Sequence, residues 1–199
     1  MHCLQGYLNI PKLDKTKMKS IINILLFTFC LTLTFCGQNS KKETIIPPDW
    51  IKLSLPNGWI LFAPKTFYTK ALQGIDTEPG VINSNKDSIY LQFDCGTAQL
   101  KSKNCSFKSE MQEAQKAIET GFYKEFYQIP LTHTAYIDTI DDKVAIFIKP
   151  NVSGQGTVGI NITDCTTSEW LGITGKNLSP EKEKVVLAIF KTIRLTQTE

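Results

Sequence analysis

The sequence is short of the residues on which most catalytic and metal sites depend. It has two histidines among 199 residues, and only His133 lies beyond the first 35. It contains no C-x-x-C pair and no G-x-S-x-G nucleophile motif. These absences argue against a zinc site and against a serine hydrolase of the nucleophile-elbow type. We expect no metal ion and no other cofactor.

His133 fits two interpretations. It shares its strand phase with Ala135 and Ile137, which places it at the edge of a packed face. A structural or solvent-exposed histidine is the simpler interpretation. The alternative is an envelope hydrolase in which His133 is the base, with an aspartate such as Asp138 and a serine brought near by the fold.

The mature chain also lacks a surplus of either charge. The whole sequence has 22 basic and 19 acidic residues. Residues 1–35 carry four of the lysines and one of the acids, so the remainder has eighteen of each sign. Binding of nucleic acid needs a clustered positive face. We therefore expect no nucleic-acid partner.

No apolar run is long enough for a conventional transmembrane helix. The longest, IINILLFTFCLTLTFC, runs from Ile21 to Cys36 and follows three lysines between residues 15 and 19. A spanning helix needs roughly 18 or more apolar residues. Basic residues before a short apolar run are typical of a secretory signal. We predict a signal peptide over residues 1–35, with Met18 as an alternative start.

The signal ends in Leu-Thr-Phe-Cys, which resembles the bacterial lipobox, where the cysteine becomes the lipid-modified first residue. Phe35 departs from the small residue usual before that cysteine. Polar residues follow, and residues 36–49 are predicted to form a flexible tether. We expect a lipoprotein of the bacterial cell envelope, held at the membrane by acyl groups such as palmitate on Cys36, with its domain outside the cytoplasm. A cleaved signal and an uncleaved anchor are the alternatives.

Three cysteines follow the predicted lipid site: Cys95, Cys105 and Cys165. Export makes oxidation available to them. Cys95 and Cys105 flank one loop between a strand and a helix, so we predict a disulfide between these two. Cys165 would then remain as a buried free thiol.

Side-chain periodicity predicts a single α+β domain over residues 50–196. Strands are predicted at 50–55, 59–63, 88–93, 132–140, 143–149, 157–163 and 170–174, with an irregular hairpin over 70–81. One helical stripe starts at Ser109, which forms a capping box with Gln112, passes through Gly121 and ends before Pro130. A second helix starts at Ser179. These elements suit one antiparallel sheet with a long middle helix and a C-terminal helix packed on it.

Three further motifs each have a structural and a functional interpretation. Gly154 to Gly159 match G-x-G-x-x-G, but a strand follows where dinucleotide binding needs a helix, so a hairpin loop is favoured. Asp138, Asp141 and Asp142 suit a solvated hairpin tip, with calcium or acid–base chemistry as the alternative. The tyrosines at 123 and 127 border an apolar helical stripe, or else cradle an aromatic ligand.

Two segments resemble the PsbP-like family: LSLPNGWILFAP at residues 53–64 and VVLAIFKTIRL at residues 185–195. That family includes extrinsic photosystem II proteins, Ran-binding import factors and many bacterial lipoproteins. The resemblance implies an α/β/α sandwich over an antiparallel sheet. It also implies a role in binding or scaffolding other proteins rather than in catalysis.

The sequence therefore favours a lipid-anchored, non-catalytic binding or scaffold module of the cell envelope. Its protein partner would bind exposed loops such as Lys70–Lys86 and Pro150–Gly156. Two alternatives remain. One is the hydrolase that uses His133, and the other is a carrier of a small apolar ligand held between helix and sheet.

Overall fold

The computed structural model describes residues 44–97 and 105–196. The predicted signal peptide and the lipid site at Cys36 lie outside the described residues. The strands are β1 (Trp50–Ser54), β2 (Trp59–Pro64), β3 (Tyr68–Ala71), β4 (Gly80–Ser84), β5 (Ile89–Thr97), β6 (His133–Ile140), β7 (Lys143–Pro150), β8 (Thr157–Asp164), β9 (Glu169–Lys176) and β10 (Arg194–Leu195). The helices are α2 (Phe107–Thr120), α3 (Phe122–Phe126) and α4 (Pro180–Phe190).

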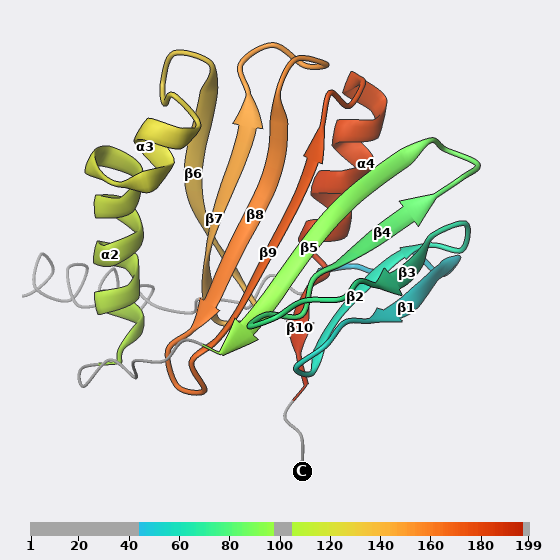
Figure 1. The fold of residues 1–199 in the computed structure, drawn as a ribbon, viewed down its shortest axis with the longest axis horizontal. Helices are drawn as coiled ribbons and strands as arrows, with labels where there is room; N and C mark the ends of the chain where they lie inside the picture. Colours follow the sequence, from blue (N-terminus) through green and yellow to red (C-terminus); the bar gives the residue numbers. More distant parts are fainter. Residues whose placement is uncertain (1–43, 98–104, 197–199) are drawn as a thin grey trace, which may run out of the picture. The chain divides into compact units, whose positions relative to one another are not determined.

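Seven strands form a large sheet in the order β3-β4-β5-β9-β8-β7-β6 (Figure 1). All of its neighbouring strands are antiparallel. Successive side chains point to opposite faces of a strand. Leu91, Ile160 and Ile173 thus line one face of the sheet and are fully buried. The prediction of a mixed α+β domain with antiparallel strands is confirmed.

The first hairpin belongs to a second, smaller sheet in the order β1-β2-β10. Asn57 and Gly58 turn the hairpin with positive φ, as the Asn-Gly pair predicts. Strand β10 pairs with β2 from the far end of the chain, and the Thr192 hydroxyl accepts the Phe62 N–H at 2.8 Å. The prediction of one sheet is therefore wrong, because the two-residue strand β10 carries too little alternation to be recognised in sequence.

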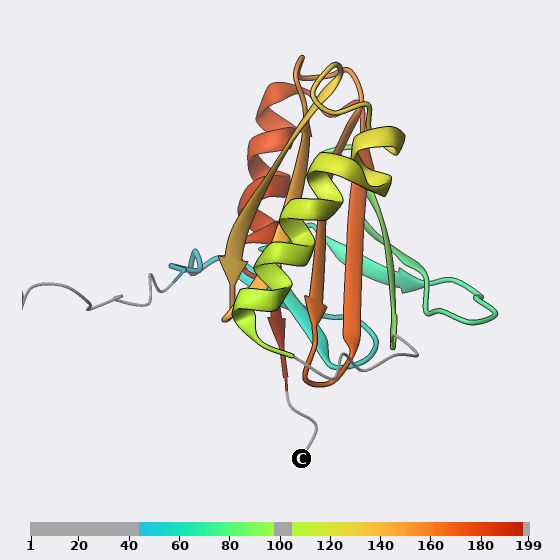
Figure 2. The same cartoon turned by 90° about the vertical axis from the view of Figure 1, so that its left-hand side faces the viewer.

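Helices α2 and α4 pack against opposite faces of strand β7 (Figure 2). Phe147 meets Phe190 of α4, with their ring centroids 6.4 Å apart. Val144, Ile146 and Ile148 point to the other face and pack with Ala114 of α2. The apolar run of β7 is thus covered on both sides. The strand lies next to the sheet edge, however, and not at its centre.

The long middle helix expected from the sequence is broken into α2 and α3. The break is at Gly121, which is extended with φ −107° and ψ −160°. Glycine disfavours a helix interior by about 1 kcal/mol relative to alanine, which makes this residue the weakest point of the stripe. The helix also begins earlier than predicted. Ser106 is its N-cap and exchanges hydrogen bonds with Ser109, so the Ser109–Gln112 capping box is incorrect.

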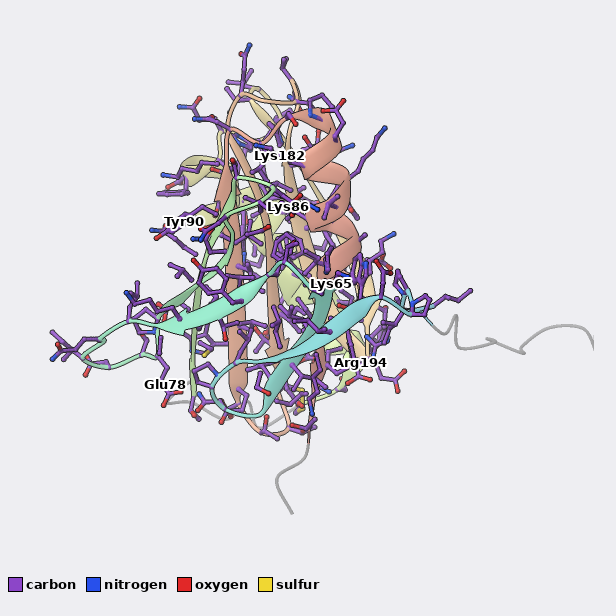
Figure 3. The ribbon with its side chains drawn as sticks, turned by 90° about the vertical axis from the view of Figure 1, so that its right-hand side faces the viewer. Lys65, Glu78, Lys86, Tyr90, Lys182 and Arg194 are labelled. Carbon is purple, nitrogen blue, oxygen red and sulfur yellow. A yellow bond between two sulfur atoms is a disulfide. The ribbon has the colours of Figure 1, made fainter. Side chains whose placement is uncertain are left out.

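Among the described residues, helices α2 and α3 leave part of their sheet face uncovered. Helix α2 packs on β6 and β7, while β5 and β9 continue beyond it (Figure 1). Tyr90 of β5 is 51% exposed and points outward (Figure 3). The edge of α2 therefore meets an open sheet surface.

Candidate functional site

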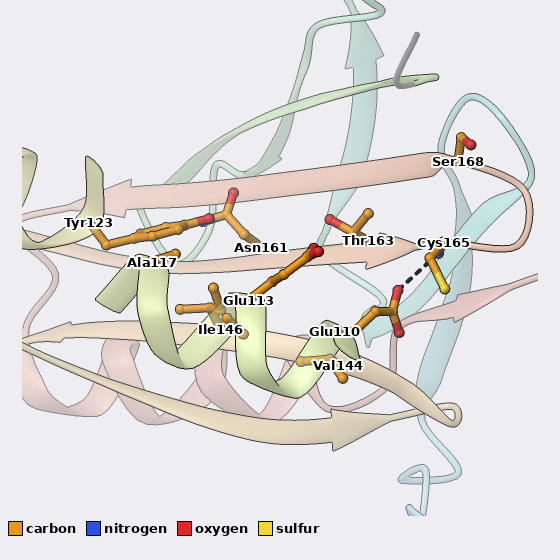
Figure 4. Close-up of a pocket in the computed structure, with 11 residues that line it drawn as sticks. Glu110, Glu113, Ala117, Tyr123, Val144, Ile146, Asn161, Thr163, Cys165 and Ser168 are labelled. Atoms are coloured by element: carbon orange, nitrogen blue, oxygen red, sulfur yellow. Dashed lines mark hydrogen bonds between the residues drawn. The ribbon is translucent and has the colours of Figure 1, made fainter. Parts of the chain in front are cut away.

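A cavity of about 290 Å³ lies between α2 and the large sheet (Figure 4). Its apolar lining is Ala114, Ala117, Tyr123, Val144 and Ile146. Its polar lining is Glu110, Glu113, Asn161, Thr163, Cys165 and Ser168. The cavity has the mixed lining of a small-molecule site, near the lower end of the usual size range.

Secondary-structure periods explain how these side chains meet. Residues three and four apart on a helix share a face, so Glu110, Glu113 and Ala117 all point from α2 toward the sheet. Residues two apart on a strand share a face, which brings Asn161 and Thr163 of β8 to the same cavity. In Figure 4, Glu113 extends from α2 toward Thr163, while the Tyr123 ring extends from α3 toward Asn161.

A disulfide joins Cys105 to Cys165 at the rim of the cavity. The predicted Cys95–Cys105 pairing is therefore wrong, as is the prediction that Cys165 is free. Cys95 points into the core from β5 and is fully buried, whereas Cys105 precedes α2 on the opposite face. The Cα atoms of Cys105 and Cys165 lie 5.5 Å apart, which is an ordinary disulfide separation.

The Cys95 thiol is shielded from chemistry. Burial, with smaller contributions from the charges of Glu78, Asp94 and Glu169, raises its pKa to about 12. Its Sγ donates a hydrogen bond to the Glu78 carbonyl at 3.4 Å. Because the thiolate is the reactive form of cysteine, Cys95 is not a nucleophile at neutral pH.

Glu110 is the most enclosed charge in the cavity. Its carboxylate accepts the Cys165 N–H at 2.9 Å. Burial raises the pKa of Glu110; the charges of Asp164 and Glu113 add to the rise, while the Cys165 bond and Lys143 oppose it. The Cys165 hydrogen bond and the charge of Lys143 therefore do not fully offset the cost of burying the Glu110 carboxylate.

Asp164 and Ser168 shape the β8–β9 turn beside Glu110. Burial alone would raise the pKa of Asp164, but hydrogen bonds from Thr166 and the charge of Lys143, 3.5 Å away, together lower it. Ser168 has positive φ and is only 3% exposed. Its Oγ has no hydrogen-bond partner among the described residues. The cavity lining thus contains a buried hydroxyl that can still donate and accept a hydrogen bond.

Tyr123 closes the apolar end of the cavity. Burial, with a smaller contribution from Tyr127, raises the pKa of its hydroxyl to about 12, so the hydroxyl stays neutral. The two tyrosine rings stack with centroids 6.2 Å apart. The sequence allowed these tyrosines either to border an apolar stripe or to hold an aromatic ligand. Tyr123 lines the cavity, so it can contact a ligand. Tyr127 is buried in the packing between helix and sheet.

A second depression, of about 350 Å³, adjoins the cavity on the open half of the sheet. Asn161 lines both. Trp170 and Leu72 contribute apolar surface, and Asp94 contributes a carboxylate with one buried oxygen that has no partner within the described part of the chain. Leu72 belongs to the predicted 70–86 partner surface, so part of that segment lies near the site.

His133 is held by the backbone and is remote from this cavity. Its Nε2 accepts the Thr157 N–H at 2.9 Å, and its Nδ1 lies 2.9 Å from the Tyr127 carbonyl, which fixes the Nδ1–H tautomer. Asp138 is five residues along the same strand and therefore points to the other face. The hydrolase alternative needs an aspartate beside the His133 ring and a ring nitrogen that can accept a proton. Asp138 points away from the ring, and both ring nitrogens already bond to the backbone.

The two remaining sequence motifs are structural. Gly154 and Gly156 have positive φ in the β7–β8 loop, as the hairpin interpretation predicted, and a Cβ at Gly156 would lie 2.7 Å from His133 Nε2. Asp141 pairs with Arg194 at 3.6 Å. Within residues 44–97 and 105–196, no group of three or more histidine, cysteine or acidic side chains is arranged to hold a metal ion.

Most of the cavity residues were not identified from the sequence. Glu110 and Glu113 have the same spacing as solvent-facing acids on any amphipathic helix. Only their position on the same helix face as Ala114 and Ala117 could have suggested a site. Over the described residues, no helix is both long enough and apolar enough to cross a bilayer. Comparison with known proteins gives no match, either to a family model or to a curated protein.

Proposed function

We propose that this chain is a lipid-anchored, non-catalytic binding module of the bacterial cell envelope, and that it binds a small molecule in the cavity between α2 and the large sheet. The observation that carries the proposal is the cavity itself, which has an apolar floor and a few convergent polar groups. The arrangement of His133 supports a non-catalytic role, because both ring nitrogens already bond to the backbone.

The cavity favours a small ligand over a purely scaffolding role. A scaffold needs an extended exposed surface, whereas this space is a half-open hollow between α2, α3 and the strands β7 and β8. The position agrees with the carrier alternative, which places its ligand between helix and sheet. A tether on Cys36 would keep such a module at the membrane face where envelope solutes pass.

The PsbP-like resemblance belongs to this proposal as well. The packing of α2 and α4 on opposite faces of strand β7 supports the sandwich that the resemblance implies. The resembling segments, residues 53–64 and 185–195, include β2, most of α4 and β10. We therefore propose a PsbP-like domain whose α2 side carries a small-molecule site.

Native mass spectrometry of the full-length protein, extracted from its own cells in mild detergent, tests the function. We expect a retained small molecule on the wild type. Ala117→Leu should abolish it by filling the cavity. Ala188→Leu is the matched control, because it makes the same change on an exposed face of the other long helix, α4.

A ligand retained equally by both leucine variants would overturn the cavity as the site. An activity screen against ester, peptide and glycoside substrates addresses the hydrolase alternative. Turnover that is abolished by His133→Ala would replace the binding module with an enzyme.

A further inference from the structure

The charged side chains that line the cavity and the adjoining depression are all acidic, and Lys143 lies beside the cavity without lining it. Glu110 and Glu113 line the cavity. Asp94 lines the adjoining depression, which shares Asn161 with the cavity. No lysine, arginine or histidine belongs to either lining. Lys176 and Lys182 line a separate depression, with Tyr90 and Thr174, on the open half of the sheet. An anion in the cavity would therefore meet only repulsion from its walls.

Glu110 and Tyr123 lie at opposite ends of the lining (Figure 4). Glu110 and Cys165 mark the end at the β8–β9 turn, and Tyr123 marks the other end (Figure 4). Val144 and Ile146 form the floor beneath α2. A ligand that fits both ends has a compact polar head and an apolar body.

Hydrogen-bond capacity at the polar end also favours a donor-rich head. Glu113 and Glu110 supply carboxylate oxygens, and Thr163 supplies a hydroxyl. The Ser168 hydroxyl is buried and has no partner in the described structure. An ammonium group offers three N–H donors and one positive charge, and so matches acceptors of this kind.

We propose that the cavity binds a small organic ammonium ion with an apolar body, the ammonium group lying between Glu110 and Glu113 and the body lying over Val144 and Ile146. This proposal rests on the proposed function and narrows its ligand to one chemical class. A bare metal ion fits less well, because the acids here are two and the rest of the lining is largely apolar.

Isothermal titration of the full-length protein in mild detergent tests the ligand class. The probes are hexylammonium, 1-hexanol and hexanoate, which share one apolar chain and differ in the head group. We expect hexylammonium to bind about tenfold or more tighter than 1-hexanol, and hexanoate to bind weakest. Glu113→Gln should remove the tenfold advantage of hexylammonium over 1-hexanol.

Glu119→Gln is the matched control, since Glu119 is an exposed acid on the same helix outside the cavity and should leave the advantage intact. Equal binding of hexylammonium and 1-hexanol, with both lost in Ala117→Leu, would overturn the ammonium class and retain the cavity as a ligand site. Tightest binding of hexanoate would also overturn the class. Failure of all three probes at about 10 mM would overturn the cavity and the class together.

Discussion

A single imidazole connects three segments of the chain. His133 lies on β6, its Nδ1–H donates to the Tyr127 carbonyl after α3, and its Nε2 accepts the Thr157 N–H at the start of β8. Gly156 is next to this ring, and a side chain there would collide with it. At this scale the histidine and the glycines of the loop form one structural unit, which a motif search divides into two unrelated candidates.

His133→Ala should lower the free energy of unfolding by about 1–3 kcal/mol, because it leaves a carbonyl and an N–H without their ring partner. The measurement is urea unfolding of both proteins. Thr139→Ala, an exposed change on the same strand, should alter stability far less. Coincident unfolding midpoints for His133→Ala and the wild type would show that the ring bonds contribute nothing.

Asp164 gives the domain a pH-dependent contribution to stability. Its pKa is lowered in the folded protein, despite burial, by Thr166 and Lys143. A lowered folded-state pKa means that the stabilisation is present above the unfolded value of 3.8 and is lost as the pH falls through the folded pKa. Asp164→Asn should therefore destabilise the protein by about 1–2 kcal/mol near pH 7 and progressively less below 3.8.

Urea unfolding of wild type and Asp164→Asn across a pH series measures this difference. Asp138→Asn is the control, since Asp138 is exposed. A stability difference for Asp164→Asn that stayed constant down to pH 2 would contradict the assignment.

At the scale of elements, helix α2 is fixed at its start and leaves the sheet at its end. The Cys105–Cys165 bond holds its N-terminus to the β8–β9 turn. Gly121 releases the chain into α3 at the other end. The distance between α2 and the sheet, and with it the width of the cavity, is therefore determined by one covalent link and by the apolar contacts of Ala114.

Cys105→Ser with Cys165→Ser should destabilise the domain substantially. The bond spans 60 residues, and the chain-entropy relation assigns a loop of that length about 4 kcal/mol. Chemical unfolding of oxidised wild type and the double variant measures the loss. A reductant should destabilise the wild type by a similar amount and leave the double variant unchanged.

Peptide mapping without reduction provides the decisive control for this pairing. A peptide bridge that contains Cys95, or two free thiols at Cys105 and Cys165, would contradict it. Cys95→Ala should keep the Cys105–Cys165 bridge intact.

Most of the strands could be predicted because each carries its own alternation, whereas β10 is too short to do so. The ranges 143–149 and 157–163 differ from β7 and β8 by one residue at the C-terminal end. The disulfide could not be predicted, because which cysteine lies near Cys105 depends on the sheet order and not on the spacing in sequence. The cavity was missed for the same reason. Glu113, Asn161 and Ser168 come from a helix, a strand and a turn, and none of these residues is unusual in its own segment of the sequence.

At the scale of the whole molecule, the proposed lipid on Cys36 determines where the cavity operates. One acyl chain gives only marginal membrane binding, whereas two or more hold a protein stably. Cys36→Ala should therefore move the domain from the membrane fraction to the soluble envelope fraction. Cell fractionation and intact mass of the wild type measure the two parts of this prediction.

Cys30→Ala is the control for that experiment, because it changes a cysteine inside the predicted signal without removing the lipid site. Retention of Cys36→Ala in the membrane, together with an unacylated wild-type mass, would reject the lipoprotein assignment.

The small sheet has a consequence for the time course of synthesis. Strand β2 is made early, but its hydrogen-bonding partners around Thr192 are made 130 residues later. At typical elongation rates this delay is on the order of ten seconds. Throughout that interval the nascent chain carries an unpaired strand edge beside Trp59 and Leu61, two side chains that are almost fully buried at the end. A truncation before Thr192 should therefore leave this strand edge unpaired and prone to aggregation.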